Sequence, residues 1–291
     1  MFVLAHLSDP HLAPLPRPHL RDLLSKRGLG YLNWLRKRRG IHRADMLAAL
    51  VEDLKHHAPD HIAVTGDLVN LSLTNEFGPA LTWLEGLGDP RDVTLVPGNH
   101  DSYVVAARDF AGRHWSGFMR GDGGEGFPFV RRRGALALIG LSTSLPTPPL
   151  AATGHLHGDQ IARLGEILAK LKLEQAFRVV MIHHPPVEGA HYFRRLTNAG
   201  ALRDVLREHG AELVLHGHHH ETSLHWLPGP QLRVPVIGVP SASGAADRHD
   251  EPAGYNLYEI EGAWGAWRCT MVSRGWRGGG FEEVNRLPLF A

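Results

Sequence analysis

His61-Ile62-Ala63-Val64-Thr65-Gly66-Asp67 is the stretch of sequence that decides the fold expected for this chain. It predicts a short buried strand that ends in a glycine turn, and the turn aims the Asp67 carboxylate out of the C-terminal end of the strand. Four other strand-like runs end in residues of the same kind, namely Asp9-Pro10-His11, Gly98-Asn99-His100-Asp101, His183-His184-Pro185-Pro186 and Gly217-His218-His219-His220. One such ending means little, but five in one chain predict a metal centre.

Composition and charge are those of an ordinary folded protein. The 291 residues are 43% hydrophobic and 21% charged, which is enough apolar material for a large core. The net charge of +1 argues against a general polyanion binder. The single cysteine, Cys269, excludes an internal disulfide and favours a reducing compartment. There is no signal-peptide pattern and no apolar run of about 20 residues, so the location expected is the cytoplasm.

Strands and helices alternate along most of the chain, and strands alone follow. Strands are expected at 2–7, 61–64, 92–96, 177–182, 211–215, 233–239, 255–260 and 267–272. Helices are expected at 44–57, 103–118, 159–171 and 197–209, with another ending near Leu87. A hairpin at 127–141 is expected to turn through Arg131-Arg132-Arg133. This order predicts an α/β fold, an αββα sandwich of two mixed sheets flanked by helices, in one domain covering residues 1–291.

The segment 14–43 does not fit this alternation. It is predicted to form two short amphipathic helices interrupted at Gly28 and Gly30, basic on one face and rich in leucine and tryptophan on the other. Nine basic residues lie from Arg17 to Arg43 against Asp22 alone, so this part carries +8 and the rest of the chain −7. We interpret 14–43 as an insertion that packs on the sandwich, covers the metal site, forms a homodimer contact or anchors the protein to an anionic membrane.

The residue types at the five strand ends indicate transition-metal chemistry. Carboxylate, imidazole and amide oxygen together suit Zn, Mn or Fe, whereas Ca prefers oxygen ligands throughout. The spacing of Asp9 and His11 lets one loop place both side chains on one cation, and His218 and His220 repeat it. Strands lying side by side would bring these loops into one crevice. Two divalent or trivalent ions about 3.5–4 Å apart would need a bridging carboxylate, for which Asp67 is the natural candidate, and would hold a hydroxide for in-line attack at phosphorus.

Each of these residues also has an ordinary interpretation. Asp9 alone is typical of a turn or a helix N-cap, and Asn99 of a left-handed backbone position. A histidine run can arise by chance in a chain with 21 histidines. The joint occurrence of all five segments in one order argues against these separate explanations. We leave His6, His216 and His219 as packing, supporting or solvent positions.

In that order the segments resemble the calcineurin-like metallophosphoesterase superfamily, whose pattern is Asp-x-His, Gly-Asp, Gly-Asn-His-Asp/Glu, His and Gly-His-x-His. The matching positions span residues 9–220, and no element is missing. The resemblance implies an αββα sandwich with two metal ions. It implies that one ion is held by Asp9, His11, Asp67 and His220, and the other by Asp67, Asn99, His183 and His218. His184, the second of its pair, is then not expected to be a ligand.

The resemblance also implies roles beside the metal ions. His100 is expected to sit over the substrate, steady the phosphorus and give a proton to the leaving oxygen, because imidazole titrates in a suitable range. Asp101 is expected to orient the ring of His100. Weaker signals mark His191 and Tyr192 as lining of the substrate entrance, and Arg194 and Arg195 as phosphate contacts or as the coat of a helix.

Within the superfamily the motifs look most like class III cyclic-nucleotide and glycerophosphodiester phosphodiesterases. The function expected is therefore metal-dependent hydrolysis of a small phosphodiester, cyclic nucleotides included. The basic segment leaves open a hydrolase of lipid pyrophosphates or phospholipid head groups at the inner face of the membrane. A binding scaffold without catalysis is less consistent with a full ligand set. No stable nucleic-acid complex is expected, because the remainder of the chain is acidic.

Overall fold

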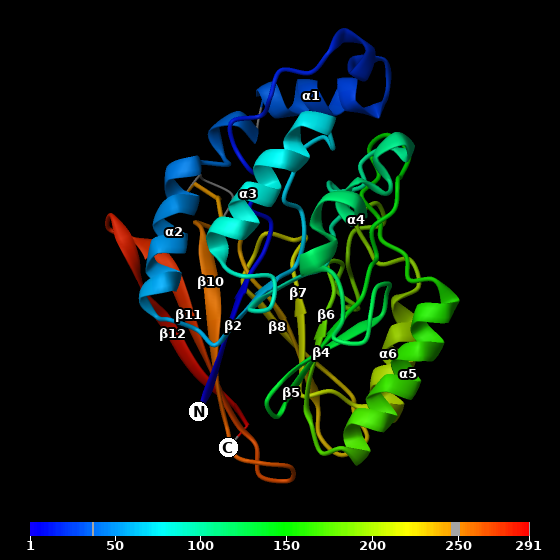
Figure 1. Ribbon diagram of the computed structural model, residues 1–291, viewed down its shortest axis with the longest axis vertical. Helices are drawn as coiled ribbons and strands as arrows, with labels where there is room; N and C mark the ends of the chain where they lie inside the picture. Colours follow the sequence, from blue (N-terminus) through cyan, green and yellow to red (C-terminus); the bar gives the residue numbers. More distant parts are fainter. Residues whose placement is uncertain (37, 246–250, 291) are drawn as a thin grey trace.

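Two six-stranded sheets form the centre of the molecule, and helices lie along their outer sides (Figure 1). The computed structural model describes residues 1–36, 38–245 and 251–290. Both sheets are mixed, because parallel strands in the middle are joined by antiparallel strands at the edges. This arrangement confirms the predicted α/β sandwich of two mixed sheets flanked by helices.

The first sheet has the strand order β12-β11-β10-β1-β2-β3. β1, β2 and β3 run parallel to one another, whereas β10 pairs with β1 in the antiparallel direction. The parallel strands therefore end at the same edge of the sheet. The strands are β1 (Phe2–Leu7), β2 (His61–Val64), β3 (Val93–Leu95), β10 (Gly254–Glu261), β11 (Arg268–Arg277) and β12 (Gly280–Phe290).

The second sheet has the order β4-β5-β6-β7-β9-β8. β5, β6, β7 and β9 are parallel, and β4 and β8 close the two edges in the antiparallel direction. The strands are β4 (Phe129–Arg133), β5 (Leu136–Gly140), β6 (Phe177–Met181), β7 (Leu213–His216), β8 (Ser223–Leu227) and β9 (Val234–Gly238).

Apolar side chains from both sheets and from the helices make the core. The larger buried cluster joins Val64 of the first sheet and Met181 of the second to Leu50 and Phe77 of the helices beside the first sheet. A second cluster lies between the second sheet and the helices α5 and α6, which Figure 1 shows on its outer side. The helices are α1 (Lys26–Arg36), α2 (Ala44–His56), α3 (Phe77–Leu87), α4 (Phe110–Trp115), α5 (Gly158–Leu173) and α6 (Ala199–His209), with 3₁₀ turns at Leu20–Leu24, Arg38–Gly40, Thr74–Glu76, Val105–Ala107 and Ser116–Phe118.

Two local predictions were wrong for physical reasons that the structure makes clear. The three arginines expected in a hairpin turn belong to β4, and the turn follows them. Arg131 is only 3% exposed, because its guanidinium donates to the backbone carbonyls of Pro90, Val93, Gly117 and Arg120. The single helix expected at 103–118 is instead divided into a 3₁₀ turn, the short α4 and a second 3₁₀ turn.

Strands β8 and β12 were not expected. Both are largely intermediate or exposed in burial, and their polar residues hide the apolar signal of a buried strand. β12 nevertheless pairs with β11 over nine residue pairs, so its place is set by backbone hydrogen bonding to its neighbour more than by burial.

The described residues of the segment 14–43 form one α-helix between two 3₁₀ turns, not the two interrupted helices that were predicted. Gly28 and Gly30 both lie inside α1, and a Cβ at Gly30 would come within 2.6 Å of the Tyr103 hydroxyl, so this glycine permits close packing. The apolar stripe is also divided, because Tyr31 and Trp34 pack inward while five leucines are exposed, namely Leu20, Leu24, Leu29, Leu32 and Leu35. Lys37 of the basic run lies outside the described residues.

Figure 1 shows α1 above the ends of the central strands, at the end of the molecule remote from both chain termini. Of the helices within the described residues, none combines the length and the apolar character that crossing a membrane would require.

Candidate metal centre

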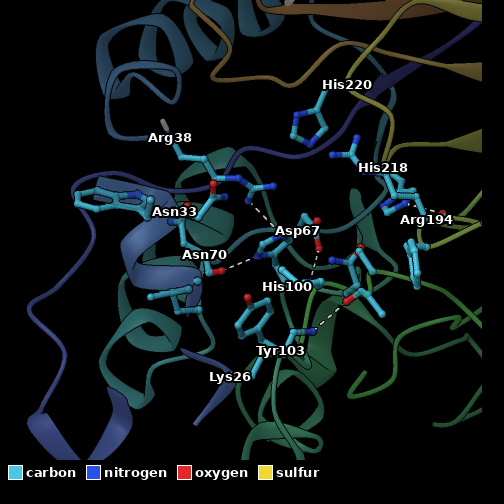
Figure 2. Close-up of a pocket in the computed structure, with 18 of the residues that line it drawn as sticks. Lys26, Asn33, Arg38, Asp67, Asn70, His100, Tyr103, Arg194, His218 and His220 are labelled. Carbon is cyan, nitrogen blue, oxygen red and sulfur yellow. Dashed lines mark hydrogen bonds between the residues drawn. The ribbon is translucent and has the colours of Figure 1, made fainter. Parts of the chain in front are cut away.

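The five predicted strand ends meet at one edge of the sandwich. Asp9 and His11 follow β1, Asp67 follows β2 and Asn99 follows β3, all from the first sheet. His183 follows β6, and His218 and His220 follow β7, from the second sheet. A cavity of about 600 Å³ opens over them, with Asp67, Asn99, His218 and His220 in its lining. Figure 2 shows Asp67 between His100 and the two histidines that follow β7.

The first group of donors surrounds a space of the size that one cation takes. His220 Nε2 lies 3.1 Å from Asp9 Oδ1 and 3.4 Å from His11 Nε2. His11 Nε2 lies 3.8 Å from both Asp9 Oδ1 and Asp67 Oδ2. Two donors bound to one ion at about 2.0–2.2 Å are roughly 3–3.5 Å apart, so this spacing fits a shared cation.

The second group shares Asp67 with the first. His183 Nε2 lies 3.4 Å from Asp67 Oδ2 and 3.3 Å from Asn99 Oδ1. Its other ring nitrogen, Nδ1, donates to the Thr65 carbonyl at 2.6 Å, which leaves Nε2 as the lone-pair atom. His218 donates through Nε2 to the Arg194 carbonyl at 2.8 Å, which leaves Nδ1 as its donor atom. Asp67 Oδ2 therefore faces both groups, as a bridging carboxylate would.

The backbone at these positions is held in a rarely adopted conformation. Asp9, His11, Asp67, His218 and His220 all have positive φ angles, from 38° to 73°. A residue other than glycine is held there at a cost of about 1–3 kcal/mol, and such strain gathers at functional sites. Five candidate donors that share this feature indicate that the fold is organised around their placement.

Two glycines allow the strand ends to approach one another. A Cβ on Gly98 would lie 2.2 Å from Asp67 Oδ1, and a Cβ on Gly217 would lie 2.4 Å from Asp9 Oδ2. Neither distance is sterically acceptable, so any side chain at these positions would push a candidate donor aside.

The electrostatics of the site favour a positive charge between the carboxylates. Burial alone would lower the pKa of His183, but the charge of Asp67, its hydrogen bond and the charge of Asp9 raise the pKa to about 9. The carboxylates thus stabilise a positive charge at Nε2 of this ring, which either a proton or a metal cation in its place would supply. The donor set of carboxylate, imidazole and amide oxygen suits a pair of transition-metal ions. Cys269 lies in β11 and takes no part.

Asp101 does not orient the ring of His100, contrary to the expectation. Its carboxylate accepts hydrogen bonds from four backbone N–H groups, those of Asp67, Leu68, Val69 and Gly98. It therefore stabilises the turn that carries Asp67, because backbone N–H groups buried away from water need an acceptor and this carboxylate serves four of them. Asp101 is a positioning residue in this structure.

The ring of His100 is held by other groups. Its Nδ1 donates to the Asn70 carbonyl at 2.5 Å, and its Nε2 lies 3.0 Å from Arg38 Nη1 (Figure 2). Tyr103 stacks on the ring with centroids 5.3 Å apart. The ring thus keeps its proton on Nδ1 and turns its Nε2 lone pair to the pocket.

The remaining histidines differ in the number of partners that they have. His184 belongs to a cluster with His183 and His218, but Thr143 Oγ1 and the Ala152 carbonyl occupy both of its nitrogens. Its partners agree with the expectation that it is not a ligand. His6 bonds to Thr65, His216 bonds to Gly217, and the half-buried His219 lines the cavity.

Of the four residues that the sequence marked only weakly, two line the cavity and two do not. His191 and Arg194 line the cavity, whereas Tyr192 does not, and Arg195 lies over the Tyr192 ring at 4.6 Å from its centroid. Sequence reasoning missed Lys26, Arg38 and His42, which also line the cavity. All three belong to the segment 14–43, and the only available signal was that this basic segment starts just after His11 and ends before the next helix.

Comparisons with known proteins agree with this geometry. A family model described as calcineurin-like phosphoesterase matches residues 2–222. The chain is 29% identical over 237 residues to a Synechococcus protein named as a probable cyclic nucleotide phosphodiesterase, covering 80% of this chain and 84% of that one. A dimetal phosphatase from Danio rerio has a TM-score of 0.67 at 14% identity, covering 99% of this chain and 98% of that one. A purple acid phosphatase from yellow lupin has a TM-score of 0.56 at 12% identity, covering 94% and 51%. The two structures show a shared fold.

Proposed function

The chain belongs to the calcineurin-like phosphoesterase family and is a metal-dependent phosphoric ester hydrolase, and from that premise we propose that it hydrolyses small phosphodiesters, cyclic nucleotides among them. One observation carries the proposal: two groups of donors share Asp67 Oδ2 on the floor of a cavity of about 600 Å³. That volume lies within the usual range for a small organic ligand, about 300–1,000 Å³. The name of the Synechococcus relative supports the choice of cyclic nucleotides.

We assign the donors to two cations that share one carboxylate. The distances support Asp9, His11, Asp67 and His220 for one ion, and Asp67, Asn99 and His183 for the other. We add His218 to the second group because its ring centroid lies 5.2 Å from that of His183 and the two rings offer ligand nitrogens within 4.8 Å of each other. Manganese, iron and zinc all suit these donor types. When bound, such a pair lowers the pKa of a water molecule and offsets charge on phosphoryl oxygens.

His100 is proposed to give the proton to the leaving oxygen. Its Nδ1–H stays hydrogen-bonded to the Asn70 carbonyl, so delivery takes place from Nε2, the nitrogen that faces the cavity. Because Nε2 carries a lone pair in this structure, it first has to take up a proton from solvent, and the ring then returns to its present form when that proton passes to the leaving oxygen. Arg38 Nη1 now lies 3.0 Å from that nitrogen and has to leave it when a substrate enters. An alkoxide leaves slowly unless it is protonated, so this proton transfer contributes most for substrates with poor leaving groups.

Arg38 is proposed to contact the anionic phosphoryl group once it leaves His100. Burial lowers the pKa of its guanidinium, but an arginine keeps its charge in a protein. Within the described residues its hydrogen-bond partner is the neutral ring of His100 and it makes no salt bridge, so a substrate anion would meet a cation that has no fixed anionic partner. A phosphodiester carries one negative charge, which one guanidinium beside the metal ions can match.

The segment 14–43 forms one wall of this cavity. Figure 2 shows Asn33 and Arg38 entering from the α1 side and Arg194 from the opposite side. Trp34 and Tyr103 add aromatic surface to the lining, which suits a flat leaving group such as a nucleoside. We propose that 14–43 is a cover inserted into a single domain and that it selects the leaving group.

A second candidate is an amphiphilic phosphate at an anionic membrane surface. The observation that favours it is the exposure of leucines on the basic segment, with Leu20 85% and Leu24 91% exposed. Leu29 and Phe193 are also more than half exposed and lie on the cavity wall, so the mouth is apolar while the floor is polar. Such a surface, together with the +8 charge of the segment, fits lipid head groups.

Side-by-side assays test the first proposal. The protein is incubated with Mn²⁺, Zn²⁺ or Fe²⁺ and with bis-nitrophenyl phosphate, nitrophenyl phosphate, cyclic AMP or a glycerophosphodiester. The proposal expects the diesters to be hydrolysed faster than the monoester. A metal-replete protein that hydrolyses only the monoester would contradict it.

Vesicle sedimentation tests the second candidate. Vesicles that contain phosphatidylserine should pull down the protein, and the Arg36→Ser/Arg39→Ser variant should stay in solution, because both arginines are exposed and lie outside the cavity. Equal sedimentation with neutral and anionic vesicles, or none with either, removes this candidate.

A further inference from the structure

His42 is a histidine of the metal centre that the sequence pattern does not include. It lies between the 3₁₀ turn Arg38–Gly40 and the start of α2, and it is 5% exposed. Its ring centroid is 4.4 Å from that of His11 and 5.8 Å from that of His220. One ligand nitrogen from each of these three rings lies within 4.8 Å of the other two.

The ring of His42 is fixed by groups on its far side. Its Nδ1 lies 2.9 Å from Ser243 Oγ, and the backbone N–H of Arg43 donates to the Ser243 carbonyl at 2.9 Å. Ser241 Oγ lies 3.4 Å from Ser243 Oγ and donates its own proton to the Asp9 carbonyl. Ser243 Oγ can therefore donate a hydrogen bond to Ser241 Oγ and accept one from the Nδ1–H of His42. This arrangement assigns the lone pair of the ring to Nε2.

With Nδ1 bonded to Ser243, Nε2 is the nitrogen of His42 left to join the group that it forms with His11 and His220. His42 lines the cavity, and within the part of the chain that the structure describes its Nε2 has no hydrogen-bond partner. In this it resembles His183, whose Nδ1 is bonded to a backbone carbonyl and whose Nε2 faces Asp67. It differs from His184, which has a partner on each nitrogen. A ring fixed at one nitrogen with the other free is the usual form of a metal-bound histidine.

We propose that His42 is an additional donor, through Nε2, to the cation held by Asp9, His11, Asp67 and His220. The inference rests on the proposed function, because it requires a cation in that place. Four protein donors leave positions open on an ion that accepts five or six ligands, and zinc also expands beyond four. His42 occupies one of these positions from the side of the segment 14–43.

The proposal joins the cover to the metal. His42 lies four residues after Arg38, and the two residues line the same cavity. A bond from His42 to the cation fixes the end of the segment, and with it the place from which Arg38 reaches His100. Loss of that cation would then release the segment 14–43 on one side of the cavity as well as the donors at the strand ends.

Metal titration of the full-length, metal-free protein tests this role without any activity measurement. Isothermal titration with Mn²⁺ gives the number and affinity of the sites, and the visible absorption of bound Co²⁺ reports coordination. His42→Asn is the main variant, because its amide can still bond to Ser243 but is too short to reach the cation. His219→Asn, a half-buried histidine in the same cavity, is the matched control.

The expected result is that His42→Asn weakens one of the two sites by about 10–100-fold, leaves the other unchanged and alters the Co²⁺ spectrum. His219→Asn should behave as the unaltered protein. Thermal unfolding of the metal-free variants establishes that both fold; His42→Gln, whose longer amide reaches toward the cation, should recover part of the affinity. Equal affinities and spectra for His42→Asn and the unaltered protein would overturn the inference. If the unaltered protein itself binds no pair of cations, the proposed function fails instead.

Discussion

Replacing Gly98 by alanine tests the position of Asp67 without removing any candidate donor. A Cβ at residue 98 would lie 2.2 Å from Asp67 Oδ1 and 2.6 Å from the Asp67 backbone nitrogen. Gly98 does not have a positive φ angle, so alanine is acceptable for the backbone and the effect is purely steric. The change therefore moves the proposed bridging carboxylate and leaves its chemistry intact.

The size of the displacement follows from the contact. Ordinary contacts of a Cβ begin at 3.4 Å, so the Asp67 carboxylate has to retreat by about 1 Å. Its hydrogen bond from the His100 backbone nitrogen, now 2.7 Å, would be lost with it. A misplacement of about 1 Å at a reacting centre costs on the order of 100-fold in rate. Overpacking of this kind also destabilises a fold by about 1–3 kcal/mol.

We expect Gly98→Ala to bind at least one metal ion more weakly and to hydrolyse bis-nitrophenyl phosphate on the order of 100-fold more slowly. Metal content and initial rates are measured on the purified protein, with urea unfolding as the check of folding. Gly86→Ala is the matched control, because Gly86 lies in α3 with nothing within 4 Å of the added Cβ. That variant should gain up to about 1 kcal/mol of stability and keep its activity. Full metal content and full activity in Gly98→Ala would refute the placement of Asp67.

Three further predictions concern single residues. Asp67→Ala should lose most bound metal and nearly all hydrolysis by metal analysis and assay, and a metal-replete active variant would contradict the bridge. His100→Ala should keep its metal but slow alkyl diesters more than nitrophenyl diesters, whereas an equal loss for both counts against proton donation. Asp53→Asn should lower the free energy of unfolding by about 2 kcal/mol at pH 7, because it weakens the bonds from Arg274 and Tyr255. Burial raises the pKa of Asp53, but those bonds lower it overall, so the stabilisation is present at neutral pH and should fade in urea unfolding below about pH 4; an undiminished difference at pH 3 would be inconsistent with the ion pair.

The strand ends could be predicted because each carries its own local signal. A buried parallel strand is a short apolar run, and Asp67 or Asn99 follows such a run directly in the sequence. Because parallel strands end at one edge, the meeting of residues from 9 to 220 followed from the order of the elements. The fold class and the class of enzyme are confirmed on this basis, and the assignment of individual ligands stays a prediction.

What could not be predicted depends on contacts between distant segments. Arg131 is buried because its guanidinium donates to backbone carbonyls of other segments, and no pattern in the sequence of β4 predicts these contacts. Asp101 lies beside His100 in the sequence, yet its carboxylate accepts hydrogen bonds from the backbone N–H groups around Asp67. His42 is flanked by arginine-rich sequence, and the direction of its ring is set by Ser243, two hundred residues away in the chain.

The proposed ligands come from both sheets, and this has a consequence for the order of assembly. Asp9, Asp67 and Asn99 follow strands of the first sheet, whereas His183 and the histidines after β7 follow strands of the second. Neither sheet alone supplies the complete set of ligands for an ion, so metal binding should accompany the packing of the two sheets against each other. Once bound, the pair of ions would cross-link the two sheets at the edge that carries the ligands. Extraction of the metal should therefore separate the sheets at this edge before it separates them at the end where the termini lie (Figure 1).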